Sequence, residues 1–179
     1  MTLIAGIDFS TKQITAAIIP LDPTVTPHVT FTHLDLPRTR DTTQRLRGLR
    51  RGMALTFWTV ELAGRAQDVT SVWVEEPWGP HRNVDRSLLP LYGGILASVP
   101  TTITATGITT RDWRTTLGLR LSGSEKKLAA IAHANLYLHQ QAGWDTNESA
   151  DVTEHECEAL CIALAGRTIT WAHHEKGTP

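Results

Sequence analysis

Acidic side chains close two separate apolar segments of the sequence, at points where an expected strand meets a loop. Asp8 lies near the end of the apolar run 3–9, and Glu75 ends the run 69–75. A carboxylate in an apolar strand is unfavourable unless it is paired, hydrogen-bonded or bound to a metal ion. Because both acids occupy the same kind of position, one explanation for the two is a shared metal site.

Two further candidate ligands lie in the segment 153–165, which has the residue pattern of a helix. His155 and Glu158 are three residues apart, so they share a face of that helix. Carboxylates with one imidazole suit Mg²⁺ or Mn²⁺ better than a thiolate-preferring zinc site. Two such ions about 4 Å apart can activate water and stabilise the attacking and leaving oxygens of a phosphodiester displacement. The combination therefore predicts metal-dependent hydrolysis of a phosphodiester.

Each of these residues has an ordinary structural explanation when it is taken singly. Asp8 could bond to the backbone of the turn that follows it. Glu75 could be a surface acid at a strand end, with Glu76 pointing inward in its place. His155 and Glu158 could be solvated side chains on the surface of a helix. Only the presence of all four together favours a metal site.

The composition is that of one globular domain of ordinary size. The chain has 179 residues, of which 41% are hydrophobic, and seventeen Lys and Arg residues against eighteen Asp and Glu give a formal net charge of -1. Nucleic-acid binding would therefore depend on local positive charge. We expect a cytoplasmic protein without a membrane segment, because no apolar run approaches about 20 residues. Cys157 and Cys161 are expected to be buried free thiols.

The hydrophobic periodicity predicts an α/β fold in which helices flank a mixed five-stranded sheet. We expect a single nuclease domain over 1–170, followed by a flexible tail over 171–179. The predicted strands are 3–9, 14–19, 28–34, 69–75 and 101–106, and the predicted helices are 41–66, 88–99, 110–117, 124–140 and 153–165.

Three motifs, in this order along the chain, resemble those of the RuvC-like Holliday junction resolvases, which belong to the RNase H-like nucleases. They are Gly-Ile-Asp at 6–8, Trp-Val-Glu at 73–75 and His-x-x-Glu-Ala at 155–159. The resemblance covers nearly the whole chain and allows a phage-type member of the family. It implies a homodimeric, structure-selective endonuclease that resolves four-way DNA junctions, with Asp8, Glu75, His155 and Glu158 binding two Mg²⁺ or Mn²⁺ ions.

The resemblance and the local charge also indicate DNA contacts. Lys126 corresponds to a family lysine that contacts the phosphate near the cut, and Trp78 to an aromatic that stacks on a base at the branch point. A partly buried loop aromatic and a solvated basic face are the alternative interpretations. The other basic candidates for phosphate contact are Arg82, Arg111, Arg114 and Lys127.

Two positions depart from the commonest family pattern, because His155 and Glu158 stand where aspartate is usual. A catalytically weak or inactive nucleic-acid-binding module is therefore one alternative function, and an endonuclease for forks or flaps is another. Actin-like sugar and acetate kinases share the opening Gly-Ile-Asp turn, but their folds need a second copy of the domain. No motif identifies a helicase partner.

Overall fold

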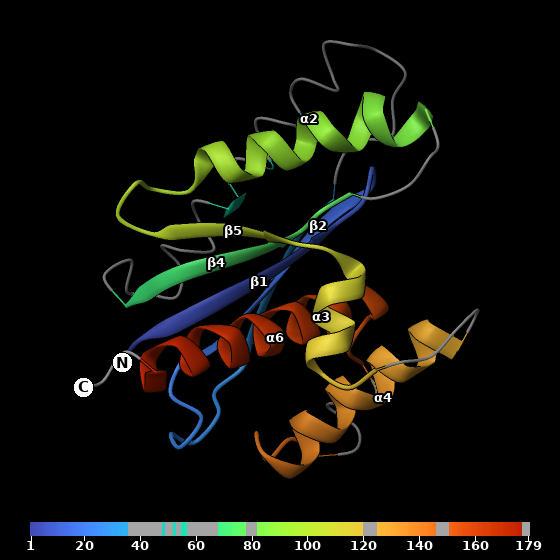
Figure 1. The fold of residues 1–179 in the computed structure, drawn as a ribbon. Coiled ribbons are helices and arrows are strands. Elements are labelled where there is room, and N and C mark those ends of the chain that lie inside the picture. Colours follow the sequence, from blue (N-terminus) through green and yellow to red (C-terminus); the bar gives the residue numbers. More distant parts are fainter. Residues whose placement is uncertain are drawn as a thin grey trace.

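Five strands form one mixed sheet in the computed structural model (Figure 1). The structure describes residues 1–35, 48, 52, 55, 56, 68–77, 82–119, 125–145 and 151–176, with only the backbone of 82–87 and 174–176. The strands are β1 (Leu3–Phe9), β2 (Gln13–Pro20), β3 (Thr30–Asp35), β4 (Val69–Glu75) and β5 (Thr104–Ile108). Their order in the sheet is β3-β2-β1-β4-β5, which confirms the predicted mixed five-stranded sheet.

The central strand β1 pairs antiparallel with β2 and parallel with β4. In the parallel pair Ile7 lies opposite Val74, so the following residues, Asp8 and Glu75, emerge at the same edge of the sheet. Strand β5 also runs parallel to β4, with Ile108 opposite Glu75. The carboxyl ends of β1, β4 and β5 therefore meet at one edge.

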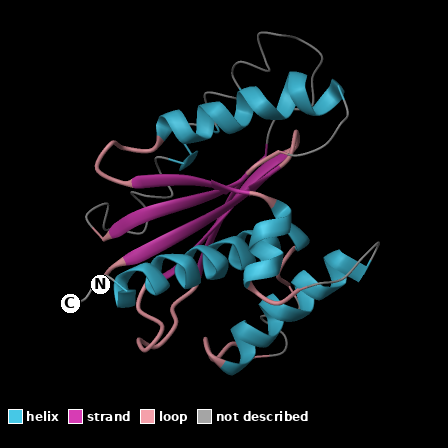
Figure 2. Ribbon diagram, in the orientation of Figure 1, coloured by secondary structure: helices cyan, strands magenta, loops and turns pink. Residues whose placement is uncertain are grey.

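Helices cover both faces of the sheet (Figure 2). Helix α2 (Arg82–Ser98) lies over one face, and α3 (Thr110–Thr116), α4 (Glu125–Gln140) and α6 (Glu154–Lys176) lie over the other (Figure 1). Successive side chains of a strand point to opposite faces. Accordingly Ile4 belongs to the core under α6, whereas Ala5 and Ile7 belong to the core under α2.

Helix α6 lies unusually close to β1 because Gly6 has no side chain. A Cβ atom at Gly6 would lie only 2.3 Å from both the Ala159 carbonyl oxygen and the Ala163 backbone nitrogen. Further along the helix, a Cβ atom at Gly166 would lie 2.5 Å from the indole ring of Trp73. Small residues at these points let the helix pack directly on the sheet.

Helix α6 is longer than the sequence predicts. It continues to Lys176, so the predicted end near Ala165 is wrong, and 171–176 are helical where a tail was expected. The hydroxyl groups of Thr168 and Thr170 donate back to the carbonyl oxygens of Leu164 and Gly166, at 2.9 and 2.8 Å. Such bonds let threonine remain within a helix.

The remaining helices begin and end near the predicted positions, with one larger difference. Helix α2 begins at Arg82, six residues before the predicted start at 88. The predicted helix 41–66 lies largely outside the described residues, although Gly48, Gly52, Leu55 and Thr56 are helical. Among the described helices, none has both the length and the apolar composition that a membrane span requires.

The two cysteines are buried in α6 as free thiols, as predicted. Burial raises the pKa of Cys157 to about 11 and raises the pKa of Cys161 further. Thiolates are therefore scarce at neutral pH, and these residues act as small apolar side chains in the core.

Candidate metal centre

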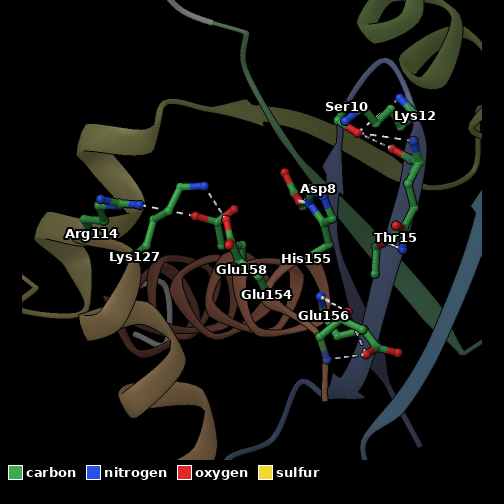
Figure 3. A network of polar contacts seen from close by, with 12 residues as sticks. Asp8, Ser10, Lys12, Thr15, Arg114, Lys127, Glu154, His155, Glu156 and Glu158 are labelled. Carbon is green, nitrogen blue, oxygen red and sulfur yellow. Dashed lines mark hydrogen bonds and ion pairs between the residues drawn. The ribbon is translucent and has the colours of Figure 1, made fainter. Parts of the chain in front are cut away.

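Side chains from β1 and α6 meet at the carboxyl edge of the sheet (Figure 3). Asp8 is buried, and its Oδ2 lies 2.5 Å from Nδ1 of His155. Glu158 joins this pair, because one ligand atom each from Asp8, His155 and Glu158 lie within 4.8 Å of one another. Three of the four predicted ligands thus form one compact group.

The start of α6 is fixed by a capping box, which determines where His155 and Glu158 lie. The Thr153 backbone N–H donates to Oε2 of Glu156 at 2.8 Å, and the Glu156 N–H donates to Oγ1 of Thr153 at 3.3 Å. This reciprocal pattern satisfies two backbone donors at a helix start. The two candidate ligands therefore occupy the first two turns of α6, over the end of β1.

Glu75, the fourth predicted ligand, lies beside this group at the end of β4. Its pKa is raised to about 7, chiefly by burial and also by the nearby carboxylates of Asp8 and Glu158, against the opposing effect of a hydrogen bond from the Thr110 hydroxyl. The parallel register of β1 and β4, with Ile7 opposite Val74, places Glu75 on the strand next to Asp8. The structure therefore puts Glu75 beside the group formed by Asp8, His155 and Glu158.

Two basic side chains contact the carboxylates of this cluster. The hydrogen bond to Asp8 raises the pKa of His155, which favours the protonated imidazolium. Arg114 Nη2 donates to Oε1 of Glu158 at 3.3 Å. Burial, Asp8 and Glu154 nevertheless raise the pKa of Glu158, because these effects outweigh the opposing charge of Arg114.

The donor set fits a hard divalent cation. Three carboxylates supply oxygen ligands and one imidazole supplies nitrogen, which suits Mg²⁺ or Mn²⁺. Burial is the largest cause of the raised pKa values of Glu75 and Glu158, and repulsion between the neighbouring carboxylates adds to it. A bound cation would relieve this repulsion.

Metal-free protein should lose stability relative to a Glu75→Gln variant as the pH rises from about 5 to 8. The pKa of Glu75 is raised from 4.5 to about 7 in the folded protein, so between these pH values the folded state keeps a proton that the unfolded chain has lost, and the resulting stabilisation declines as the pH rises toward 7. Urea denaturation of both proteins at pH 5, 6.5 and 8, with a chelator present, measures the difference. A difference between the two proteins that does not change with pH would contradict the burial of Glu75 among carboxylates.

The basic residues predicted to contact DNA lie in different settings. Lys127 Nζ lies 2.5 Å from Oε1 of Glu154 on α6, and this hydrogen bond, together with the charges of Glu154, Glu158 and Asp8, raises the pKa of Lys127. Lys126 is exposed at the neighbouring position of α4, and Arg111 is exposed on α3. Trp78 lies outside the described residues, and the side chain of Arg82 is likewise not described.

The sequence predicts that Arg111 and Arg114 are both basic residues available to contact DNA phosphates. For Arg114 the structure differs, because its side chain is buried. It is only 9% exposed, and its guanidinium stacks over the Trp113 ring at 4.7 Å while it bonds to Glu158. Thr110, which bonds to Glu75, was not singled out in the sequence. Thr110 follows the end of β5 by two residues, and β5 is the strand paired with β4. This position was the one available sign that Thr110 could lie near Glu75.

Comparisons with known proteins rest on structure, since no family model matches the sequence and no curated protein matches it significantly. Thermus thermophilus RuvC in complex with a Holliday junction substrate aligns with a TM-score of 0.68 and 12% identity, over 96% of each chain. Fowlpox virus resolvase in complex with Holliday junction DNA aligns with a TM-score of 0.59 and 11% identity, over 94% of this chain and 99% of that one. The chain therefore has the RNase H-like fold of these two resolvases.

Proposed function

We propose that this protein is a cytoplasmic, metal-dependent endonuclease that resolves four-way DNA junctions. The observation that supports the proposal most directly is the grouping of Asp8, His155 and Glu158 within 4.8 Å, with Glu75 beside them. The two similar structures add support, because both contain a Holliday junction substrate.

In this proposal the acidic cluster holds two Mg²⁺ or Mn²⁺ ions through Asp8, Glu75, His155 and Glu158. Such ions supply an activated water and stabilise the negative charge that develops at the scissile phosphate. The chain itself would orient the ligands, and the positive charge of Lys127, which pairs with Glu154 beside the cluster, would attract a phosphate. Hydrolysis would leave a 5′-phosphate and a 3′-hydroxyl.

Resolution of a four-way junction requires two symmetric incisions. We therefore propose a homodimer, in which a twofold axis relates two active sites. Trp78 and Arg82, which follow β4 in the sequence, would contact the branch point and the neighbouring phosphates. In this proposal the dimer binds branched DNA, and its two active sites cut two strands that are related by the twofold axis.

Cleavage of labelled synthetic DNA tests this function. The purified protein should introduce paired nicks near the centre of a four-way junction in Mg²⁺ or Mn²⁺, and should leave the matching linear duplex uncut. A chelator should prevent the reaction. Faster cutting of a fork or flap than of the junction would shift the proposal to those substrates. Junction binding without cutting in either metal would indicate an inactive binding module.

Lys127 should contribute to junction binding, because its exposed ammonium group lies at the border of the acidic cluster, where it pairs with Glu154. Removing a lysine that contacts a phosphate reduces the slope of log affinity against log salt by about 1. We expect this change for Lys127→Gln in Ca²⁺, measured by fluorescence anisotropy.

The matched control for this measurement is Arg167→Gln, which also removes one positive charge. Arg167 Nη1 donates to the hydroxyl of Tyr137 on α4 at 3.1 Å. The salt dependence of this control should equal that of the wild type. An unchanged slope for Lys127→Gln would exclude Lys127 from the phosphate contacts.

A further inference from the structure

Helix α3 contacts both glutamates of the candidate metal centre. The Thr110 hydroxyl donates to Oε1 of Glu75, and Arg114 Nη2 donates to Oε1 of Glu158 at 3.3 Å. Thr110 and Arg114 are four residues apart, so they lie on one face of the helix, one turn from each other. A single short helix thus reaches two ligands that come from different elements, β4 and α6.

The position of α3 is set by its own packing and capping. Trp113 is completely buried in the core that also contains α6. At the start of the helix, the Thr109 side chain accepts a hydrogen bond from the Asp112 backbone N–H. A helix of seven residues has little stability of its own. Tertiary contacts through Trp113 therefore hold Thr110 and Arg114 in fixed positions relative to the cluster.

The setting of Arg114 is that of an internal residue. Its guanidinium stacks on the buried Trp113 ring at 4.7 Å, and its side chain is 11% exposed, against 14% for the Glu158 side chain it bonds to. A buried guanidinium is costly unless it is paired with a carboxylate in good geometry. Its ability to contact a DNA phosphate is correspondingly small, whereas its contact with Glu158 is direct.

We propose that α3 is a positioning element of the metal centre, in which Thr110 orients Glu75 and Arg114 orients Glu158 for metal binding. The inference rests on the proposed function only in taking these glutamates as metal ligands. Hydrogen-bond partners behind a ligand fix its orientation, and their loss typically weakens metal affinity about 10- to 100-fold. Both residues act through the glutamates and not on the substrate.

The competing explanation makes the opposite prediction for Arg114. If its guanidinium merely competes with a metal ion for Glu158, its removal would lower the local positive charge and tighten metal binding. If it orients Glu158, its removal weakens metal binding even though the net charge becomes more favourable. The direction of the change in affinity therefore separates the two roles.

The test measures Mn²⁺ affinity of the full-length, metal-free protein without DNA, from the electron paramagnetic resonance signal of free Mn²⁺. We expect Arg114→Gln and Thr110→Val each to weaken Mn²⁺ binding by at least about tenfold. Thr110→Ser, which keeps the hydroxyl, should bind Mn²⁺ as the wild type does. Circular dichroism checks that each variant is folded, and if Arg114→Gln is not, the two Thr110 variants decide the outcome.

Two matched controls carry similar substitutions away from the glutamates. Arg167→Gln removes a guanidinium that stacks over Tyr137 at 5.4 Å, and Thr116→Val alters a threonine in the last turn of α3. Both should retain wild-type Mn²⁺ affinity. Unchanged or tighter binding in the Arg114 and Thr110 variants would overturn the positioning role.

The same titration separates this inference from the proposed function. One outcome would support the positioning role and refute the nuclease function: the wild-type protein binds Mn²⁺ but cuts no branched DNA, and both variants bind Mn²⁺ more weakly than the wild type. Junction cleavage with wild-type Mn²⁺ affinity in both variants would do the reverse.

Discussion

Asp8→Asn should abolish junction cleavage while the protein still binds the junction. Asp8 is only 5% exposed and bonds His155, so the amide would fill the same space but remove the central negative charge of the cluster. Metal ions contribute several kcal/mol of charge stabilisation to phosphoryl chemistry. Losing about 4 kcal/mol of this stabilisation would slow cleavage by about 1000-fold.

Single-turnover cleavage in Mn²⁺ measures the rate, and a gel-shift assay in Ca²⁺ measures junction binding. Asp22→Asn is the matched control, because Asp22 is a turn residue whose carboxylate accepts a hydrogen bond from the Thr24 backbone at 2.8 Å. The control should cut at the wild-type rate. Cleavage by Asp8→Asn at that same rate would exclude Asp8 from the metal centre.

Gly6→Val should destabilise the protein strongly and separate the two halves of the metal centre. The new side chain would collide with backbone atoms of Ala159 and Ala163, which cannot rotate away as a side chain can. Overpacking of this kind typically costs about 1 to 3 kcal/mol, and the contact with rigid backbone places Gly6 at the upper end. Any relief requires α6 to move away from β1, which carries His155 away from Asp8.

Urea denaturation followed by circular dichroism measures the free energy of unfolding for this variant. Gly93→Ala is the matched control, because Gly93 lies within α2 and a Cβ atom there meets nothing within 4 Å. Alanine favours a helix over glycine by about 1 kcal/mol, so this control should be slightly stabilised. A Gly6→Val variant as stable as the wild type would contradict the close packing of α6 on β1.

The convergence of the four candidate ligand side chains follows from local sequence signals. Asp8 and Glu75 each lie at the end of an apolar strand. If the two strands are parallel, both side chains are expected at the same edge of the sheet, and β1 and β4 are parallel. The spacing of His155 and Glu158 predicts a shared helical face, and the capping box at Thr153 predicts where that helix begins. Each of these signals spans only a few neighbouring residues.

The buried position of Arg114 and its contact with Glu158 could not be predicted in the same way. In the sequence it resembles Arg111, its neighbour on a short polar helix, and both suggest a basic surface. The difference arises from Glu158, which is 44 residues away and accepts the hydrogen bond of Arg114. The packing of Trp113 in the core determines which face of this helix is buried. Seven residues make only about two turns, which is too short for a hydrophobic periodicity to reveal the buried face.

The end of α6 was mispredicted for a related reason. Glycine after an alanine-rich helix usually indicates that the helix ends there. Here Gly166 is needed inside the helix because the Trp73 ring occupies the space of a side chain. The reason for this glycine lies on strand β4, far away in the sequence, so a local pattern could not distinguish the two uses.

The contact between β1 and α6 also constrains when activity can appear during protein synthesis. Asp8 and His155 are separated by 147 positions, and the two residues come from the first strand and the last described helix. A nascent or truncated chain that stops before α6 contains Asp8 and Glu75 but lacks both remaining candidate ligands, His155 and Glu158. Incomplete translation products that end before α6 would therefore contain all five strands of the described sheet but only two of the four candidate metal ligands.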